Sequence, residues 1–172
     1  GVHAPGGYRA GSLFVETCLA GLAETAITPG RVGSVPVPFL HLTVNRPALA
    51  CLGSQKAGWV LRVGGYSAMA SGPARALALK PKATYRTIGY RDRSKIGIIA
   101  LEADTLPGEE VTGYIAGECG IDPRNLYVLV APTRSLVGSI QISGRVITAT
   151  LHKLEEKGYD VLRIRHAAGR SP

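Results

Sequence analysis

The stretch from Leu126 to Lys157 constrains the fold more than any other part of the chain, because its pattern describes three successive elements. Leu126–Val130 is a continuous apolar run, which is typical of a strand buried on both faces. Pro132 and several hydroxyl residues then interrupt the pattern. From Leu136 to Lys157 apolar residues recur at helical spacing, which predicts one long helix. The unit indicates an α/β fold class with alternating strands and helices.

A polar face runs along this predicted helix. Gln141, Arg145, Thr148 and His152 fall at spacings that place them on one side. One interpretation is a solvated helix face. The other is a site in which Arg145 binds or orients a ligand, with Gln141 and Thr148 beside it.

Two glycines lie inside the same helical pattern. Gly138 and Gly144 lower helix propensity, and no turn is expected at either position. Glycine is useful where another backbone or a ligand comes close. We therefore expect close approaches at both residues.

Composition indicates a globular protein with one sizeable core. The chain has 172 residues, of which 45% are hydrophobic and 19% charged. It contains no apolar run long enough to cross a bilayer. The net charge of +8 attracts anions, but the basic residues are dispersed and only 6% of residues are aromatic. This pattern disfavours nucleic acid as a partner. The positive charge would also suit a coenzyme with an anionic tail.

Three cysteines are too few and too widely spaced for a disulfide framework or a CxxC metal site. They are Cys18, Cys51 and Cys119, and each lies among apolar or small residues. We expect buried packing roles for them in a reducing cytoplasm. Cys51 is the one candidate for a reactive thiol, because it stands beside a glycine-containing segment.

The remaining pattern supplies the other elements of the α/β prediction. The region from 53 to 58 is expected to be a loop, and so is the tail from 167 to 172. Gly64-Gly65 predicts a turn. Helices are predicted over 8–22, from Pro73, over 82–88 and over 107–119, and strands over 25–28, 39–44, 59–63, 95–102 and 161–164.

Three further positions are candidates for binding or catalysis. In the 53–58 loop, Ser54 and Gln55 offer hydrogen bonds and Lys56 a positive charge, although the segment could equally be a tight turn. Arg75 falls in the first turn of a predicted helix, where it is either a surface charge or an anion contact. Glu102 ends a predicted strand, where ligands of α/β folds gather, but a strand-end glutamate can also anchor a loop.

Three long segments of the chain resemble methenyltetrahydromethanopterin cyclohydrolases. They are Ala131–Val146, Cys51–Trp59 and Gly72–Pro81. The resemblance extends over nearly the whole chain. It implies an α/β enzyme that hydrolyses the methenyl bridge of a tetrahydropterin one-carbon carrier to a formyl group, with no metal or redox cofactor. It also implies homotrimers and a substrate cleft between two α/β domains.

The resemblance further implies which residues act. An Arg-x-x-Glu pair in the family matches Arg145 but has Thr148 at the glutamate position. Catalytic roles are thus expected for Arg145, Thr148 and Glu102. The expected substrate-binding residues are Ser54, Gln55, Lys56, Arg75, Ser135, Ser139 and Gln141.

Two other expectations follow from the same comparison. Residues 1–172 would form one cyclohydrolase-like α/β region, a fragment without the start and the C-terminal part of family members. Because a threonine cannot serve as a carboxylate base, the alternative function is a non-catalytic pterin- or anion-binding protein. A basic RNA-associated domain is a third alternative.

Overall fold

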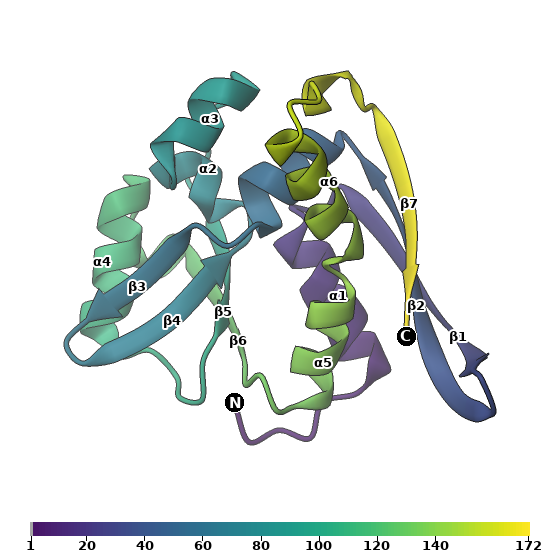
Figure 1. Cartoon of the computed structure of the whole chain (residues 1–172). Coiled ribbons are helices and arrows are strands. Elements are labelled where there is room, and N and C mark those ends of the chain that lie inside the picture. Colours follow the sequence, from purple (N-terminus) through teal and green to yellow (C-terminus); the bar gives the residue numbers. More distant parts are fainter. Residues whose placement is uncertain (1) are drawn as a thin grey trace.

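The computed structural model describes residues 2–172, which form two β-sheets with helices between and outside them (Figure 1). One sheet is antiparallel, with strand order β1-β2-β7, from Ala23–Val32, Val35–Asn45 and His166–Ser171. The other has the order β3-β4-β5-β6, from Trp59–Val63, Tyr66–Ser71, Gly97–Glu102 and Leu126–Ala131. Its β5 and β6 run parallel, whereas its other pairs are antiparallel. The α/β fold class is confirmed.

Three helices occupy the space between the two sheets in Figure 1. They are α1 (Tyr8–Cys18), α5 (Leu136–Ser143) and α6 (Val146–Glu156). Together with the helical segment η1 (Ala48–Gln55) they cover the inner face of the antiparallel sheet. Val15, Leu42, Cys51 and Ile147 belong to this buried core.

A second core lies on the other side of the mixed sheet. There α2 (Ala74–Ala78) and α4 (Glu109–Cys119) pack against the strands, with α3 (Lys82–Ile88) beyond them. Leu61, Ile99, Leu101 and Ile115 are fully buried in it. Two short 3-10 helices, η2 (Pro123–Asn125) and η3 (Val161–Arg163), complete the elements.

Several local predictions are confirmed. The turn at Gly64-Gly65 joins β3 to β4, and both glycines have positive φ angles, as a type I′ hairpin turn requires. The predicted close approach of a backbone is present at Gly138, whereas the neighbour of Gly144 is a side chain. A Cβ on Gly138 would lie 2.2 Å from the carbonyl oxygen of Pro132, and one on Gly144 would lie 2.7 Å from a methyl carbon of Val15.

Other predictions of secondary structure are wrong. The single helix from 136 to 157 is two helices that meet at Gly144 and Arg145, where packing against α1 interrupts the first. The first half of the predicted loop over 53–58 is helical, because η1 continues to Gln55. The strand over 161–164 is a 3-10 helix, and the tail pairs with β2 as strand β7. Two predicted elements are present with other bounds: the helix from Tyr8 ends at Cys18, and the strand over 25–28 extends over Ala23–Val32.

Candidate active site

The centre of the molecule holds a row of side chains that links a carboxylate to a guanidinium. Glu102 ends β5, Gln141 lies on α5, and Arg145 stands at the junction of α5 and α6. The amide of Gln141 donates to Glu102 Oε2 over 3.1 Å and accepts from Arg145 Nε over 3.0 Å. Three residues that the sequence suggested as candidates are thus brought together.

Glu102 is fixed from a second side. The hydroxyl of Thr133, in the connection between β6 and α5, donates to Glu102 Oε1 over 2.6 Å. An ionised carboxylate can accept about four hydrogen bonds. With one bond to each oxygen, Glu102 keeps acceptor capacity for a water molecule or a ligand.

Arg145 is also held by η1 and by the end of β4. Its Nη1 donates to the carbonyl oxygen of Gln55 over 3.1 Å, and its Nη2 lies 3.4 Å from the hydroxyl of Ser71. The Ser71 hydroxyl donates to the same Gln55 carbonyl over 3.0 Å. Ser71 therefore bonds the backbone of Gln55 and does not cap α2 with its side chain.

Glu102 and Arg145 both line an open groove of about 590 Å³ between the mixed sheet and α5. Its walls also include Ser67 and Met69 of β4 and the exposed carboxylate of Asp104. The groove therefore presents two carboxylates and one guanidinium to the same space. Asp104 was missed by sequence reasoning, although it follows the same strand end that drew attention to Glu102.

Thr148 lies behind this groove and not in its wall. It is 5% exposed, and its hydroxyl donates to the side-chain oxygen of Gln55. The amide nitrogen of Gln55 in turn donates to the carbonyl oxygen of Gly144 over 3.2 Å. Thr148 and Gln55 consequently connect η1 to the helix junction that carries Arg145.

The other residues around η1 contact protein atoms. The buried Ser54 hydroxyl donates to the carbonyl oxygen of Cys18 over 2.7 Å. Lys56 forms an ion pair with Glu155 over 3.0 Å. Arg75 is fully buried against backbone carbonyls, so it is neither the surface charge nor the anion contact that the sequence suggested.

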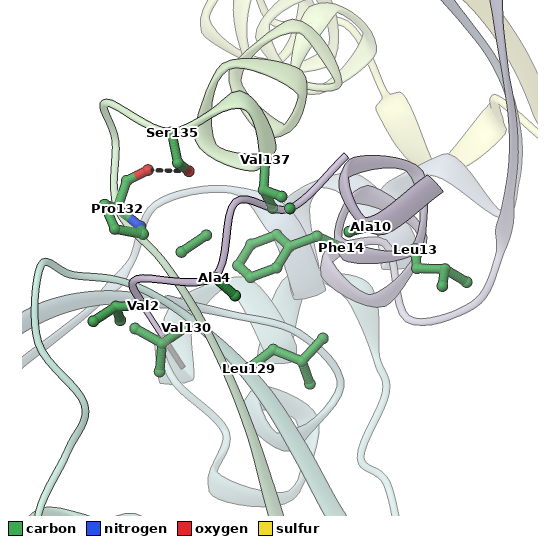
Figure 2. Close-up of a pocket in the computed structure, with 12 residues that line it drawn as sticks. Val2, Ala4, Ala10, Leu13, Phe14, Leu129, Val130, Pro132, Ser135 and Val137 are labelled. Carbon is green, nitrogen blue, oxygen red and sulfur yellow. Dashed lines mark hydrogen bonds between the residues drawn. The ribbon is translucent and has the colours of Figure 1, made fainter. Parts of the chain in front are cut away.

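Ser135 and Ser139 lie away from the groove. Ser135 caps α5 by accepting from the backbone N–H of Gly138 over 2.9 Å, and it donates to the carbonyl of Pro132. It also lines a separate, mostly apolar pocket of about 350 Å³ against Phe14 (Figure 2). Ser139 borders a third, smaller cavity beside β2. The structure brings neither serine to Arg145.

All three cysteines are buried and free. Burial raises the pKa of Cys18 to about 12 and that of Cys51 to about 11. Thiols with such pKa values are not nucleophiles at neutral pH. The expected buried packing role of the cysteines is confirmed.

The fold and the groove define an α/β protein whose central site joins an acid to an arginine through a glutamine. Comparison with known families assigns it further. The model of a family described as Cyclohydrolase (MCH) matches residues 1–172. The chain belongs to this family.

Individual relatives agree with this assignment. The chain is 53% identical over 172 residues to the methenyltetrahydromethanopterin cyclohydrolase of Methanospirillum hungatei, and the match covers 100% of the chain and 55% of that protein. It is 51% identical over 175 residues to the enzyme of the same name from Methanocaldococcus jannaschii, covering 100% of the chain and 54% of the relative. The chain thus spans about half the length of the curated relatives it matches.

Within residues 2–172, no helix is both long enough and apolar enough to cross a membrane.

Proposed function

We propose that this chain hydrolyses the methenyl bridge of methenyl-tetrahydromethanopterin to the formyl form in one-carbon metabolism. The observation that supports this function most strongly is the hydrogen-bonded row of Glu102, Gln141 and Arg145, whose charged ends line one groove. The name of the relatives, methenyltetrahydromethanopterin cyclohydrolase, supports the same reaction.

The chemistry of the substrate suits this groove. The methenyl carbon is part of a cationic amidine and is already electrophilic, so the proposed reaction calls for no metal or redox cofactor. Water adds to the carbon and loses a proton. A carbon–nitrogen bond then breaks as the released nitrogen takes up a proton and the hydroxyl on the carbon loses its proton to become the formyl oxygen, so that one proton is released overall. The site needs a group that attracts the cation, holds the water and exchanges its proton.

Glu102 is the group proposed for these tasks. Its carboxylate lines the groove and keeps acceptor capacity for water. Arg145 would orient the substrate through its carbonyl or carboxylate oxygens, because guanidinium groups bind such oxygens strongly. Gln141 keeps the two charges at a fixed separation. Thr148 would act indirectly, by holding the Gln55 amide that supports the helix junction.

The test follows the absorbance of a methenyl-tetrahydropterin in a weakly catalytic buffer, with pterin binding measured in parallel. We expect the chain to accelerate the loss of absorbance above the spontaneous rate, and Arg145→Ala to abolish the acceleration. Pterin binding without acceleration would reject the enzymatic function and favour a non-catalytic pterin-binding protein. Absence of both would reject the groove as a pterin site.

We also propose a homotrimer in the cytoplasm. The family resemblance supports the trimer, and exposed apolar side chains on neighbouring strands provide a surface for subunit contacts. Ile98 of β5 stands opposite Tyr127 of β6, and both are exposed. The three free cysteines suit a reducing compartment. Light scattering with Tyr127→Lys as the comparison tests the assembly: the variant should be smaller than the parent chain.

A further inference from the structure

Arg75 is an unusual arginine because its whole side chain is buried and its hydrogen-bond partners among residues 2–172 are all backbone carbonyls. The side chain is 0% exposed. Its Nε donates to the carbonyl oxygen of Lys80 over 2.9 Å. Its Nη1 donates to the carbonyl oxygens of Ser54, over 2.8 Å, and Lys56. Burying a charge is costly unless hydrogen bonds compensate it. The hydrogen bonds of Arg75 offset this cost and also fix the positions of the three carbonyl groups.

Two of the three carbonyls flank the residue that supports the groove arginine. Ser54 and Lys56 stand on either side of Gln55, whose own carbonyl accepts from Arg145 Nη1 over 3.1 Å. Two arginines therefore hold three successive backbone carbonyls of one segment. Any rotation of the peptide groups around Gln55 would disturb the bonds of both guanidinium groups.

The positive charges of the two arginines also repel each other. Burial is the main cause that lowers the pKa of Arg75 to about 10; Tyr85 opposes this shift, and the positive charge of Arg145 contributes to it. Arg75 remains protonated at neutral pH at this value. The carbonyl dipoles of 54–56 are shared between two like charges and stabilise both.

The surroundings of Arg75 leave it little freedom. A Cβ on Gly58 would come within 2.9 Å of both Arg75 Nη2 and Pro81 Cδ. Arg75 Nη2 has no hydrogen-bond partner among the described residues. Its place is therefore set by its other two nitrogens and by packing against this glycine.

We propose that Arg75 is a positioning residue that sets the orientation of the Arg145 guanidinium through the backbone of Gln55. The contribution of Arg75 to catalysis rests on the function proposed above, whereas the structural coupling between Arg75 and Arg145 does not depend on that function. The two parts can therefore be tested separately.

The first test is the exchange rate of the Arg145 Nη–H protons with solvent, because Nη1 donates to the Gln55 carbonyl. The exchange is followed by NMR with labelled arginine, and the signals are assigned with Arg145→Lys. In Arg75→Lys, an ammonium cannot reproduce the forked contacts. In Gly58→Ala, the new methyl displaces the Arg75 guanidinium without removing its charge. Each variant should exchange about tenfold faster, as expected for weakening one charge-assisted hydrogen bond.

Tyr85→Phe is the matched control. The Tyr85 hydroxyl donates over 2.8 Å to the carbonyl of Gly53, in the same helical segment but outside the carbonyls that flank Gln55. This variant should be less stable and should keep the parent exchange rate. An unchanged rate in the folded Arg75→Lys and Gly58→Ala proteins, or an equally faster rate in Tyr85→Phe, would overturn the proposal.

Turnover supplies the second readout. If the parent chain hydrolyses the methenyl substrate, Gly58→Ala should lower kcat more than it raises KM, whereas Tyr85→Phe should leave both near the parent values. A parent chain without turnover would contradict the proposed function and leave the exchange result to decide the coupling.

Discussion

Gln141 separates the two charged groups that define the groove. In a direct ion pair, the carboxylate oxygens of Glu102 and the guanidinium N–H groups of Arg145 would form hydrogen bonds with each other. The neutral amide contacts one atom of each instead, Glu102 Oε2 and Arg145 Nε. Both charged groups therefore stay fixed in place while keeping capacity to bind a substrate or a water molecule.

Replacement of the groove carboxylate should affect turnover and leave the fold intact. Glu102→Gln keeps the shape of the side chain but removes its charge and its basicity, so we expect turnover to fall by about 10²–10⁴-fold, the usual range for a lost acid or base. Asp104→Asn is the matched control, since Asp104 lines the same groove. Methenyl absorbance measures both. Equal losses in the two variants would show that the groove acts only through its overall charge.

Thr148 should contribute to stability through its hydroxyl. Thr148→Val keeps the shape of the side chain and leaves the buried Gln55 oxygen without its donor, so we expect a loss of about 1–3 kcal/mol in the free energy of unfolding. Thr148→Ser keeps the hydroxyl and should lose less. Urea denaturation measures both variants, and a Val variant as stable as the parent would refute the importance of this bond.

The elements recovered from the sequence are those whose pattern is local. The strand β6 is a continuous apolar run, and the β3–β4 hairpin is marked by two glycines. The predicted burial of β6 on both faces is wrong, because Tyr127 is exposed. The strand β7 was missed because His166–Ser171 is small and polar and is ordered by pairing with β2. The segment η1 was missed because its glycine and polar residues read as a loop, although every residue of it is buried. Its helical form depends on tertiary packing.

The junction between β6 and α5 offers a test of element packing. Gly138→Ala would place a Cβ 2.2 Å from the Pro132 carbonyl oxygen, so the backbone must shift. We expect a loss of about 1–3 kcal/mol in the free energy of unfolding, the usual range for overpacking. Gly113→Ala, inside α4 with nothing within 4 Å of the new Cβ, should instead stabilise the chain by up to about 1 kcal/mol. Denaturant titrations compare the pair, and a Gly138 variant as stable as the parent would contradict the close packing.

At the scale of the whole molecule, the site was partly predictable because its members follow simple rules. Helical spacing grouped Gln141 with Arg145, and the rule for strand ends selected Glu102. The burial of Arg75 and Gln55 was not predictable, because it arises where η1 meets α2 and α6, from parts of the chain far apart in the sequence. The family resemblance placed Ser135 and Ser139 at the site, but these two serines line other cavities.

The stability of the whole chain should fall at alkaline pH. Burial raises the pKa of Cys18 from 9.0 to about 12 and that of Cys51 to about 11. Above pH 9 these thiols ionise more readily in the unfolded chain, which then binds fewer protons than the folded chain. The free energy of unfolding should decrease from pH 9 towards pH 12. Cys18→Ala should show a shallower decrease in urea denaturation, and an equal slope would contradict this cause.

A double-mutant cycle on turnover with Glu102→Gln, Arg145→Lys and the combination tests most directly whether the two charged groups act together, because Arg145→Lys keeps the positive charge and a measurable rate. If the two charged groups act as one unit joined by Gln141, the double variant should lose about as much activity as the more damaging single variant. If the fold-loss of turnover in the folded double variant equals the product of the two single losses, Glu102 and Arg145 act independently. That result would contradict a site in which the two residues act as one unit.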